Sequence, residues 1–324
     1  MSTTPLTVSR RGLITASTGL AAGLSVGGPA VSAAVGTSAT TPGLAALRAK
    51  ARDGVFYGAI ISPTTTVRDF ERQLGHPLGS RRNYHPANQV DQLLRRAAED
   101  VAAGRLSVLS IKPKGTWRAI ARGKRNGWLN RILDGLAELD GPVCFTINHE
   151  PENDTRGRGS GMTAYWHRRM TQYVVKKARR RAPNVEVIQV LMAWTFHPLS
   201  RRRPKKWLAR NVSLFGIDAY NWWSPSNPEA ARWVEFGTLV DRVKRFAGDR
   251  PLVVAEYGTR TDPNQPGRAA QWMYDAYDYA LANNVLTMNY FNTAPRGVKE
   301  PFILDSERLA AFRECLLDPQ SVTL

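Results

Sequence analysis

The stretch Pro142–Glu150 reads PVCFTINHE and shows the pattern that recurs along the chain. A run of apolar and β-branched residues ends abruptly in a polar Asn-His-Glu triplet. The stretch Leu252–Gly258, LVVAEYG, repeats the pattern and places Glu256 near the end of an otherwise apolar run. Short, continuously apolar runs are typical of strands that are buried on both faces, as in a parallel sheet.

Eight runs of this kind are spaced along the chain, and helical patterns separate them. The runs are Val55–Ile61, a weak one near Arg81–His85, Leu106–Ile111, Pro142–Asn148, Val185–Trp194, Leu214–Tyr220, Leu252–Tyr257 and Val285–Phe291. Helical patterns cover Val90–Ala103, Asn126–Leu139, Thr163–Arg181, Trp233–Phe246 and Gly267–Asn283. The alternation indicates an α/β protein, and eight strands predict a (β/α)8 TIM barrel. An open doubly wound sheet is the competing architecture, but no Gly-rich phosphate loop follows the first run.

The first 34 residues have the layout of an export signal. Arg10 and Arg11 are their only charged residues, an apolar stretch from Leu13 to about Val26 follows, and the small residues Ala30–Ala34 come last. This order is typical of a signal peptide, and the paired arginines favour secretion by the twin-arginine pathway. An uncleaved membrane anchor is the alternative.

We therefore expect three segments: residues 1–34 as the signal peptide, 35–52 as a flexible linker rich in Thr, Ser, Pro, Gly and Ala, and 53–324 as one barrel domain. Beyond residue 35 no stretch has the roughly 20 apolar residues that a membrane span needs. We expect a monomer.

The chain is strongly basic, with a formal net charge of +18. This charge favours an anionic partner such as an acidic polysaccharide or wall polymer. A basic surface without a specific partner is the alternative, because Arg and Lys are spread along the chain; the densest run is Arg201–Lys206. No nucleic-acid-binding motif is present, so no nucleic-acid partner is expected. The two Cys and five His do not stand at zinc-ligand spacing, and we expect no metal and no cofactor.

Glu150 and Glu256 are the candidate catalytic residues. Each lies at the C-terminal end of a predicted strand, where barrels place their active-site groups. Two carboxylates suit glycoside hydrolysis, in which one protonates the leaving oxygen and the other attacks the anomeric carbon or activates water. A structural carboxylate bound to an arginine is the alternative for either residue alone. Glu152 and Asp154, in the loop that follows, are rival acids.

The order of these motifs resembles glycoside hydrolase family 26, the β-mannanase family of the retaining TIM-barrel clan. His149-Glu150 matches the acid/base of that family, which directly follows a His, and Glu256–Gly258 matches its Glu-aromatic-Gly nucleophile motif. Gly216–Asn221, GIDAYN, matches its sixth strand. The resemblance covers roughly residues 54–315. It implies an endo-acting hydrolase of a β-linked polysaccharide that works by double displacement, with Glu150 as acid/base and Glu256 as nucleophile.

The resemblance also implies that His149 forms a hydrogen bond close to the nucleophile or to the sugar, and that the Tyr220 hydroxyl donates a hydrogen bond to Glu256. The loop after Glu150 departs from the family pattern, because it is polar, Gly-rich and basic where mannanases carry a Trp-rich segment. Mannan and an anionic wall or capsular glycan therefore both stay open as substrates. A non-catalytic carbohydrate- or wall-binding protein on a degenerate glycosidase barrel is the alternative function.

Aromatic and histidine side chains at the predicted strand ends are candidate substrate contacts, since sugar rings stack on aromatic faces. They are Trp194, His197, Tyr220, Trp222, Trp223, Tyr290 and His85, in addition to His149. Core packing is the alternative for each aromatic residue. It is weaker for Trp222 and Trp223, which lie in a polar stretch.

Overall fold

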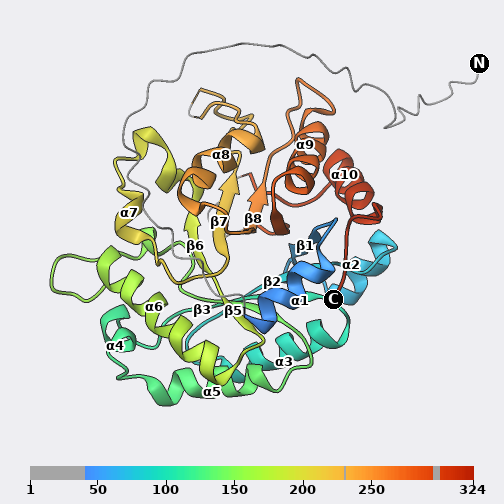
Figure 1. The fold of residues 1–324 in the computed structure, drawn as a ribbon. Helices are drawn as coiled ribbons and strands as arrows, with labels where there is room; N and C mark the ends of the chain where they lie inside the picture. Colours follow the sequence, from blue (N-terminus) through green and yellow to red (C-terminus); the bar gives the residue numbers. More distant parts are fainter. Residues whose placement is uncertain (1–40, 230, 295–299) are drawn as a thin grey trace, which may run out of the picture. The chain divides into compact units, whose positions relative to one another are not determined.

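Nine parallel strands form one continuous sheet, and helices surround it (Figure 1). The computed structural model describes residues 41–324 except 230 and 295–299, so the predicted signal peptide lies outside the described residues. The strands are β1 Phe56–Ile60, β2 Ser80–His85, β3 Leu106–Ile111, β4 Val143–Ile147, β5 Val185–Val187, β6 Gln189–Met192, β7 Phe215–Tyr220, β8 Leu252–Gly258 and β9 Val285–Phe291. Their order in the sheet is β5-β4-β3-β2-β1-β9-β8-β7-β6.

β5 and β6 are two halves of one strand, interrupted at Ile188. β5 pairs with β4, and β6 pairs with β7. The Ile188 amide donates to the Phe145 carbonyl at 2.9 Å, and the Glu150 amide donates to the Val190 carbonyl at 3.1 Å. These bonds join the two ends of the sheet. The predicted (β/α)8 barrel is therefore confirmed, with β8 as its seventh strand.

The helices are α1 Pro42–Lys50, α2 Val67–Leu74, α3 Val90–Ala102, α4 Trp117–Ala121, α5 Asn126–Ala137, α6 Ala164–Arg181, α7 Pro204–Trp207, α8 Phe236–Ala247, α9 Arg268–Ala282 and α10 Ser306–Leu317. Three short 3-10 turns lie at the strand ends: η1 Pro151–Asn153, η2 Ala193–Phe196 and η3 Pro198–Ser200. The five predicted helices correspond to α3, α5, α6, α8 and α9. No described helix is long and apolar enough to cross a membrane.

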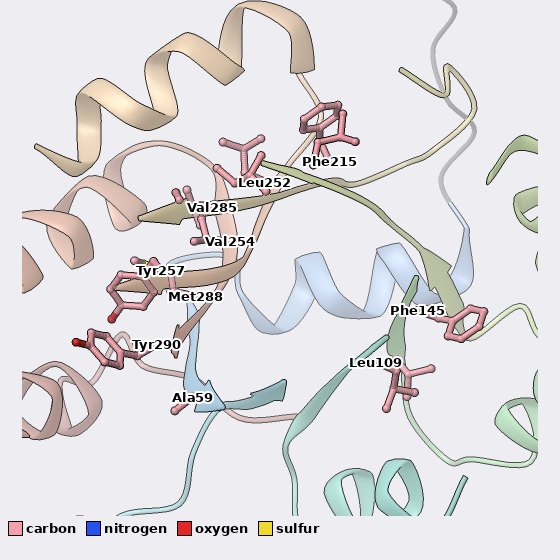
Figure 2. Packing of buried hydrophobic residues seen from close by; sticks show 14 of the residues in the cluster. Ala59, Leu109, Phe145, Phe215, Leu252, Val254, Tyr257, Val285, Met288 and Tyr290 are labelled. Atoms are coloured by element: carbon pink, nitrogen blue, oxygen red, sulfur yellow. The ribbon is translucent and has the colours of Figure 1, made fainter. Parts of the chain in front are cut away.

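Alternating strand residues build two apolar layers. On β8, Val253 and Ala255 belong to the cluster inside the barrel, while Leu252 and Val254 belong to the layer between barrel and helices. Figure 2 shows part of this outer layer, in which Tyr257 packs beside Met288 and other buried side chains. The alternation follows from the period of two in an extended strand. It also decides which side chains can reach the interior of the barrel.

Helix α1 closes the N-terminal end of the barrel. Thr41 caps the helix and Pro42 occupies its first turn, both common at helix N-termini. Leu44 and Leu47 are buried in the interior cluster, and the Leu44 amide donates to a carboxylate oxygen of Glu186 at 3.1 Å. The expectation of a flexible linker over residues 35–52 is therefore wrong for Pro42–Lys50, because its Leu residues complete the barrel core. Residues 35–40 lie outside the described part.

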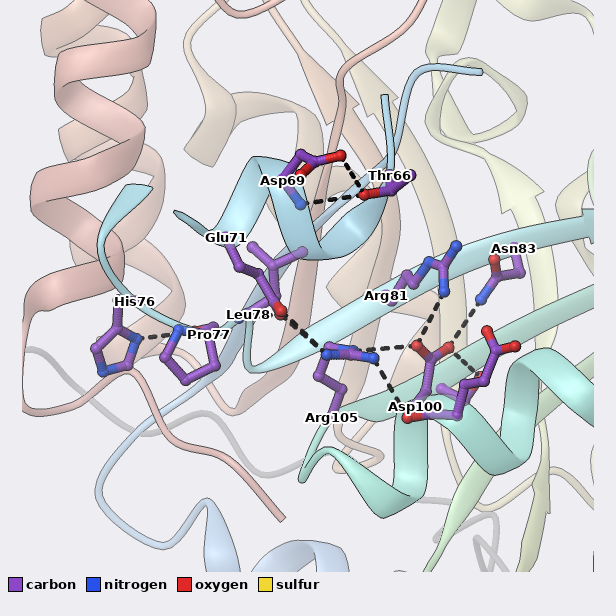
Figure 3. Close-up of polar contacts among 12 residues, drawn as sticks. Thr66, Asp69, Glu71, His76, Pro77, Leu78, Arg81, Asn83, Asp100 and Arg105 are labelled. Atoms are coloured by element: carbon purple, nitrogen blue, oxygen red, sulfur yellow. Dashed lines mark hydrogen bonds and ion pairs between the residues drawn. The ribbon is translucent and has the colours of Figure 1, made fainter. Parts of the chain in front are cut away.

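A buried ionic cluster holds α3 against β2 and β3 (Figure 3). Asp100 is fully buried and accepts hydrogen bonds from Arg81 at 3.3 Å, Arg105 at 3.1 Å and Asn83 at 2.9 Å. Ser107 donates to the same carboxylate at 2.9 Å. These contacts explain the weak apolar pattern of the second strand, since the outward side chains of β2 bind a carboxylate in place of packing on apolar groups.

Replacing Asp100 by Ala leaves two buried guanidinium groups without their shared acceptor. We expect the Asp100→Ala variant to lose about 3–5 kcal/mol of unfolding free energy, measured by urea denaturation. The control is Asp69→Ala, which breaks an exposed pair with Arg72. A loss from Asp100→Ala no larger than that of the control would contradict the role of the cluster.

Candidate active site

Glu150 follows β4 on a strained piece of backbone. Its φ is 44°, and that of Asn148 is 62°. Both values lie in the left-handed region, which residues other than Gly rarely adopt. Such strain costs about 1–3 kcal/mol a residue and gathers at functional sites. The hydrogen bond from the Glu150 amide to the Val190 carbonyl stabilises the turn. Asn153 Nδ2 donates to the Glu150 side chain at Oε2, at 3.1 Å.

Glu256 faces the barrel interior because β8 carries one additional residue. Ile217 pairs with Val254, but the next residue of β7, Asp218, pairs with Glu256. The register with β9 shifts over the same residues. This bulge leaves Ala255 as the additional residue. Simple alternation from Val254, which faces the helices, would have placed Glu256 on the outer face.

Two buried donors hold the carboxylate of Glu256. The Tyr220 hydroxyl donates to Oε2 at 2.7 Å, and Arg82 Nη2 lies 3.5 Å from Oε1. Arg82 comes from β2, and its guanidinium also lies over the ring of Tyr84, 4.7 Å from the centroid. The arrangement compensates a negative charge on Glu256, which is only 5% exposed.

The surroundings of Glu150 favour its protonated form. Burial, followed by the negative charges of Glu256 and Glu152, raises the pKa of Glu150 to about 8, against opposing effects of Arg82 and Asn153. Glu150 is therefore mainly protonated at neutral pH. The site thus pairs a proton donor with a carboxylate whose charge is compensated, and the two are close enough to influence each other electrostatically.

Asp218 is a third acid at this site, and it was not among the predicted residues. It is buried opposite Glu256, and neither of its carboxyl oxygens has a hydrogen-bond partner among the described residues. Burial, then the charges of Glu256 and Glu150, raises its pKa well above the usual range. A neutral Asp218 avoids placing another negative charge beside Glu256.

His149 contacts Ser110 through its ring. Its Nδ1 lies 2.7 Å from the Ser110 hydroxyl, and the ring packs against Tyr84 with centroids 5.1 Å apart. Burial, then Arg82 and Lys112, lowers the pKa of His149 well below its usual value, so the ring is neutral. Among the described residues its hydrogen bond is with Ser110, on β3, and not with Glu256.

The rival acids after Glu150 have structural partners. Glu152 is buried, and its Oε1 accepts from the Met192 amide at 3.2 Å and from the Thr195 hydroxyl at 2.6 Å. Asp154 accepts from Lys112 at 2.8 Å and from the side chain of Asn148 at 2.7 Å. These contacts tie the loop after β4 to the neighbouring strands.

Trp194 and Trp222 are the predicted aromatic contacts that the structure leaves exposed. Trp194 is 48% exposed and stacks on His197, with centroids 4.4 Å apart, while the His197 ring accepts from the Leu199 amide at 3.1 Å. Trp222 is 54% exposed and packs against Tyr220 with centroids 5.1 Å apart. Both follow strands at the C-terminal end of the barrel.

The structure does not support substrate contact by Trp223, Tyr290 or His85. Trp223 is buried against Trp233, and Tyr290 is fully buried in the layer between barrel and helices, where its hydroxyl donates to the Thr259 carbonyl at 3.1 Å. His85 is buried on the outer face of β2. Burial, then Arg96 on α3, lowers its pKa to about 4. His85 and Tyr290 lie at strand ends as predicted but face the helices, and Trp223, in the loop after β7, packs against Trp233, so none of the three presents a free face.

Two inward side chains of β2, Arg82 and Tyr84, lie at the candidate site and were not among the predicted residues. Arg82 and Tyr84 alternate with Arg81 and Asn83, whose side chains turn outward. The sequence does contain a sign of them. In a barrel strand, alternate residues face the interior, so alternate polar residues of SRRNYH, residues 80–85, are expected to point inward. Asp218 lies two residues before Tyr220 on the same strand, so the two side chains are expected on the same face.

Solved structures match this fold, although no protein-family model and no curated protein matches the chain. The catalytic domain of a GH26 endo-β-1,4-mannanase from Bacillus sp. JAMB-750 is 16% identical, with a TM-score of 0.59 over 86% of this chain and 89% of that one. A modular family 26 endo-β-1,4-mannanase from Cellulomonas fimi is 13% identical, with a TM-score of 0.59 over 88% and 76%. A GH10 xylanase from Bispora sp. MEY-1 is 11% identical, with a TM-score of 0.54 over 83% and 99%.

The chain has the (β/α)8-barrel fold of these glycoside hydrolases. The family resemblance inferred from the short motifs is thus matched at the level of the fold.

The raised pKa of Glu150 makes the stability of the protein depend on pH. The unfolded chain releases this proton near pH 4.5 and the folded protein near pH 8, so the stability contributed by Glu150 falls as pH rises between these values. Gln does not titrate. We expect Glu150→Gln to raise the melting temperature relative to wild type by an amount that grows from pH 4.5 to 8 and then levels off. A difference that stays constant from pH 5 to 8 would contradict the assignment.

Proposed function

We propose that this protein is a secreted, retaining, endo-acting glycoside hydrolase that cleaves a β-linked polysaccharide by double displacement. The observation that carries the proposal is the contrast between two acids at the C-terminal end of the barrel. Glu150 is held in its protonated form, and Glu256 has the donors Tyr220 and Arg82 to compensate its charge. Two carboxyl groups with different environments are what an acid and a nucleophile require.

In the first step Glu150 gives its proton to the glycosidic oxygen while Glu256 forms a bond to the anomeric carbon. The bond between that carbon and the leaving oxygen breaks, and a glycosyl-enzyme is left. In the second step the ionised Glu150 takes a proton from water, and the water oxygen displaces Glu256 from the anomeric carbon. Glu150 thereby recovers its proton.

The surroundings of the site support a polysaccharide substrate. Trp194 and Trp222 present exposed aromatic faces at the same end of the barrel as the two acids. The solved structures with this fold include two endo-β-1,4-mannanases and a xylanase. Digestion of a panel of mannan, xylan, mixed-linkage glucan and acidic polysaccharides identifies the sugar and the linkage within the β-linked class.

Secretion is also part of the proposal. The paired Arg10 and Arg11, the apolar stretch after them and the small residues Ala30–Ala34 support export through the twin-arginine pathway. We propose that the exported protein acts as a monomer.

Removal of either acid should abolish most hydrolysis of any substrate that the wild type cleaves. We expect Glu150→Gln to lower kcat/KM by about 100- to 10,000-fold, the usual contribution of general acid–base catalysis, and Glu256→Gln by at least as much. The control is Glu138→Gln, on the exposed end of α5. Near-wild-type hydrolysis by either site variant would refute the assignment, as would binding of glycans without any hydrolysis by the wild type.

The pH profile tests the proton on Glu150 directly. The first step needs this proton, and the protonated fraction falls once the pH exceeds the pKa of about 8. We expect kcat/KM to decline above about pH 8, approaching tenfold for each further pH unit. If kcat/KM instead stays level up to pH 10 while the protein remains folded, Glu150 is not the acid.

A further inference from the structure

A polar cavity of about 410 Å³ opens beside Glu150, between the loops that follow β3 and β4. Its volume lies within the range of small-molecule sites, about 300–1,000 Å³. Asn153, which donates to Glu150, and Asn148 line the cavity. A sugar bound at Glu150 would therefore lie next to this space.

The lining of the cavity is unusual for a glycan subsite. It includes Lys112, Asp154 and Arg156 but no aromatic side chain, so no sugar ring can stack there. Recognition in this cavity has to use charges and hydrogen bonds. The exposed aromatic faces of Trp194 and Trp222 belong to other loops, after β6 and β7.

The charges of the cavity favour an anion. Asp154 accepts from Lys112 and Asn148, so its negative charge is already compensated. Lys112 uses one of its three donors in that contact and is 50% exposed, which leaves donors for a ligand. Arg156 is exposed, and within the described ranges no acceptor binds its guanidinium group and no carboxylate lies at ion-pair distance. The two basic side chains outnumber the single acid.

We propose that this cavity binds an anionic substituent, a carboxylate or a sulfate ester, on the sugar next to the bond that is cleaved. The inference rests on the proposed hydrolase function and narrows its substrate class to an acidic polysaccharide. Asp154 acts as a positioning residue that fixes Lys112 at the rim, and Arg156 supplies a planar group of donors suited to carboxylate and sulfate oxygens. The strongly basic chain, whose +18 charge includes only Arg10 and Arg11 from the proposed signal peptide, adds a long-range attraction for such a polymer.

A binding experiment can test the cavity without catalysis. The probes are β-1,4-linked mannotetraose, the matching tetramer of β-1,4-linked mannuronate, and 6-O-sulfated mannotetraose, which share ring and linkage and differ at C6. Calorimetry on the Glu256→Gln protein should give a Kd at least about tenfold lower for one or both acidic tetramers than for the neutral one. Which acidic tetramer binds more tightly distinguishes carboxylate from sulfate.

The variants Lys112→Ala and Arg156→Ala, made in the same background, should each remove most of this preference and leave the Kd of the neutral tetramer within about twofold. Arg156→Lys should restore part of the preference. The control is Lys50→Ala, which removes the same charge from α1 at the opposite end of the barrel. Equal affinity for neutral and acidic tetramers, or a preference that survives both Ala variants, would overturn the proposal.

Failure of this proposal and failure of the proposed function give different results. If the wild type cleaves a neutral glycan and neither cavity variant changes its binding of acidic tetramers, the hydrolase stands and the anion site is refuted. If the acidic tetramers bind through Lys112 and Arg156 but the wild type hydrolyses no member of the panel, the anion site stands and the hydrolase is refuted.

Discussion

The additional residue in β8 decides which face of the barrel Glu256 occupies. With strict alternation from Val254, which packs against the helix layer, Glu256 would also point toward the helices and away from a substrate. The bulge at Ala255 turns it inward, where Tyr220 on β7 and Arg82 on β2 contact its two oxygens. Three strands that are distant in sequence therefore meet at one carboxylate. Bulges next to active sites commonly redirect a side chain in this way.

Burial and the charge of Glu256 together set the protonation of its neighbours. Burial raises the pKa of Glu150 and of Asp218, and the negative charge of Glu256 adds to the effect. Arg82 partly opposes these effects. Burial, one arginine and one inward carboxylate thus give the two acids different environments, which is the contrast that hydrolysis by two carboxylates needs.

Sequence patterns predicted the barrel, because apolar runs are local features, and they placed Glu150 and Glu256 at the C-terminal ends of strands, where the structure also has them. They failed where the outcome depends on neighbouring strands. His85 and Tyr290 end strands as predicted but face the helices, and Arg82 was overlooked because β2 is polar on both faces. The bulge is visible only as a difference in register between β8 and its two partners. The sequence predicted a linker at helix α1 because the stretch that contains it is rich in Thr, Ser, Pro, Gly and Ala, although the buried Leu44 and Leu47 of the helix complete the core.

The most direct test of the proposed double displacement is to trap the glycosyl-enzyme. The protein is incubated with a 2-deoxy-2-fluoro glycoside that carries a good leaving group and is built on the sugar that the protein cleaves. The modified peptide is then identified by mass spectrometry. We expect a stable adduct on the carboxylate of Glu256, and none in the Glu256→Gln variant. An adduct on Glu150 or Asp218 would contradict it, as would turnover of a natural substrate with inversion of the anomeric configuration.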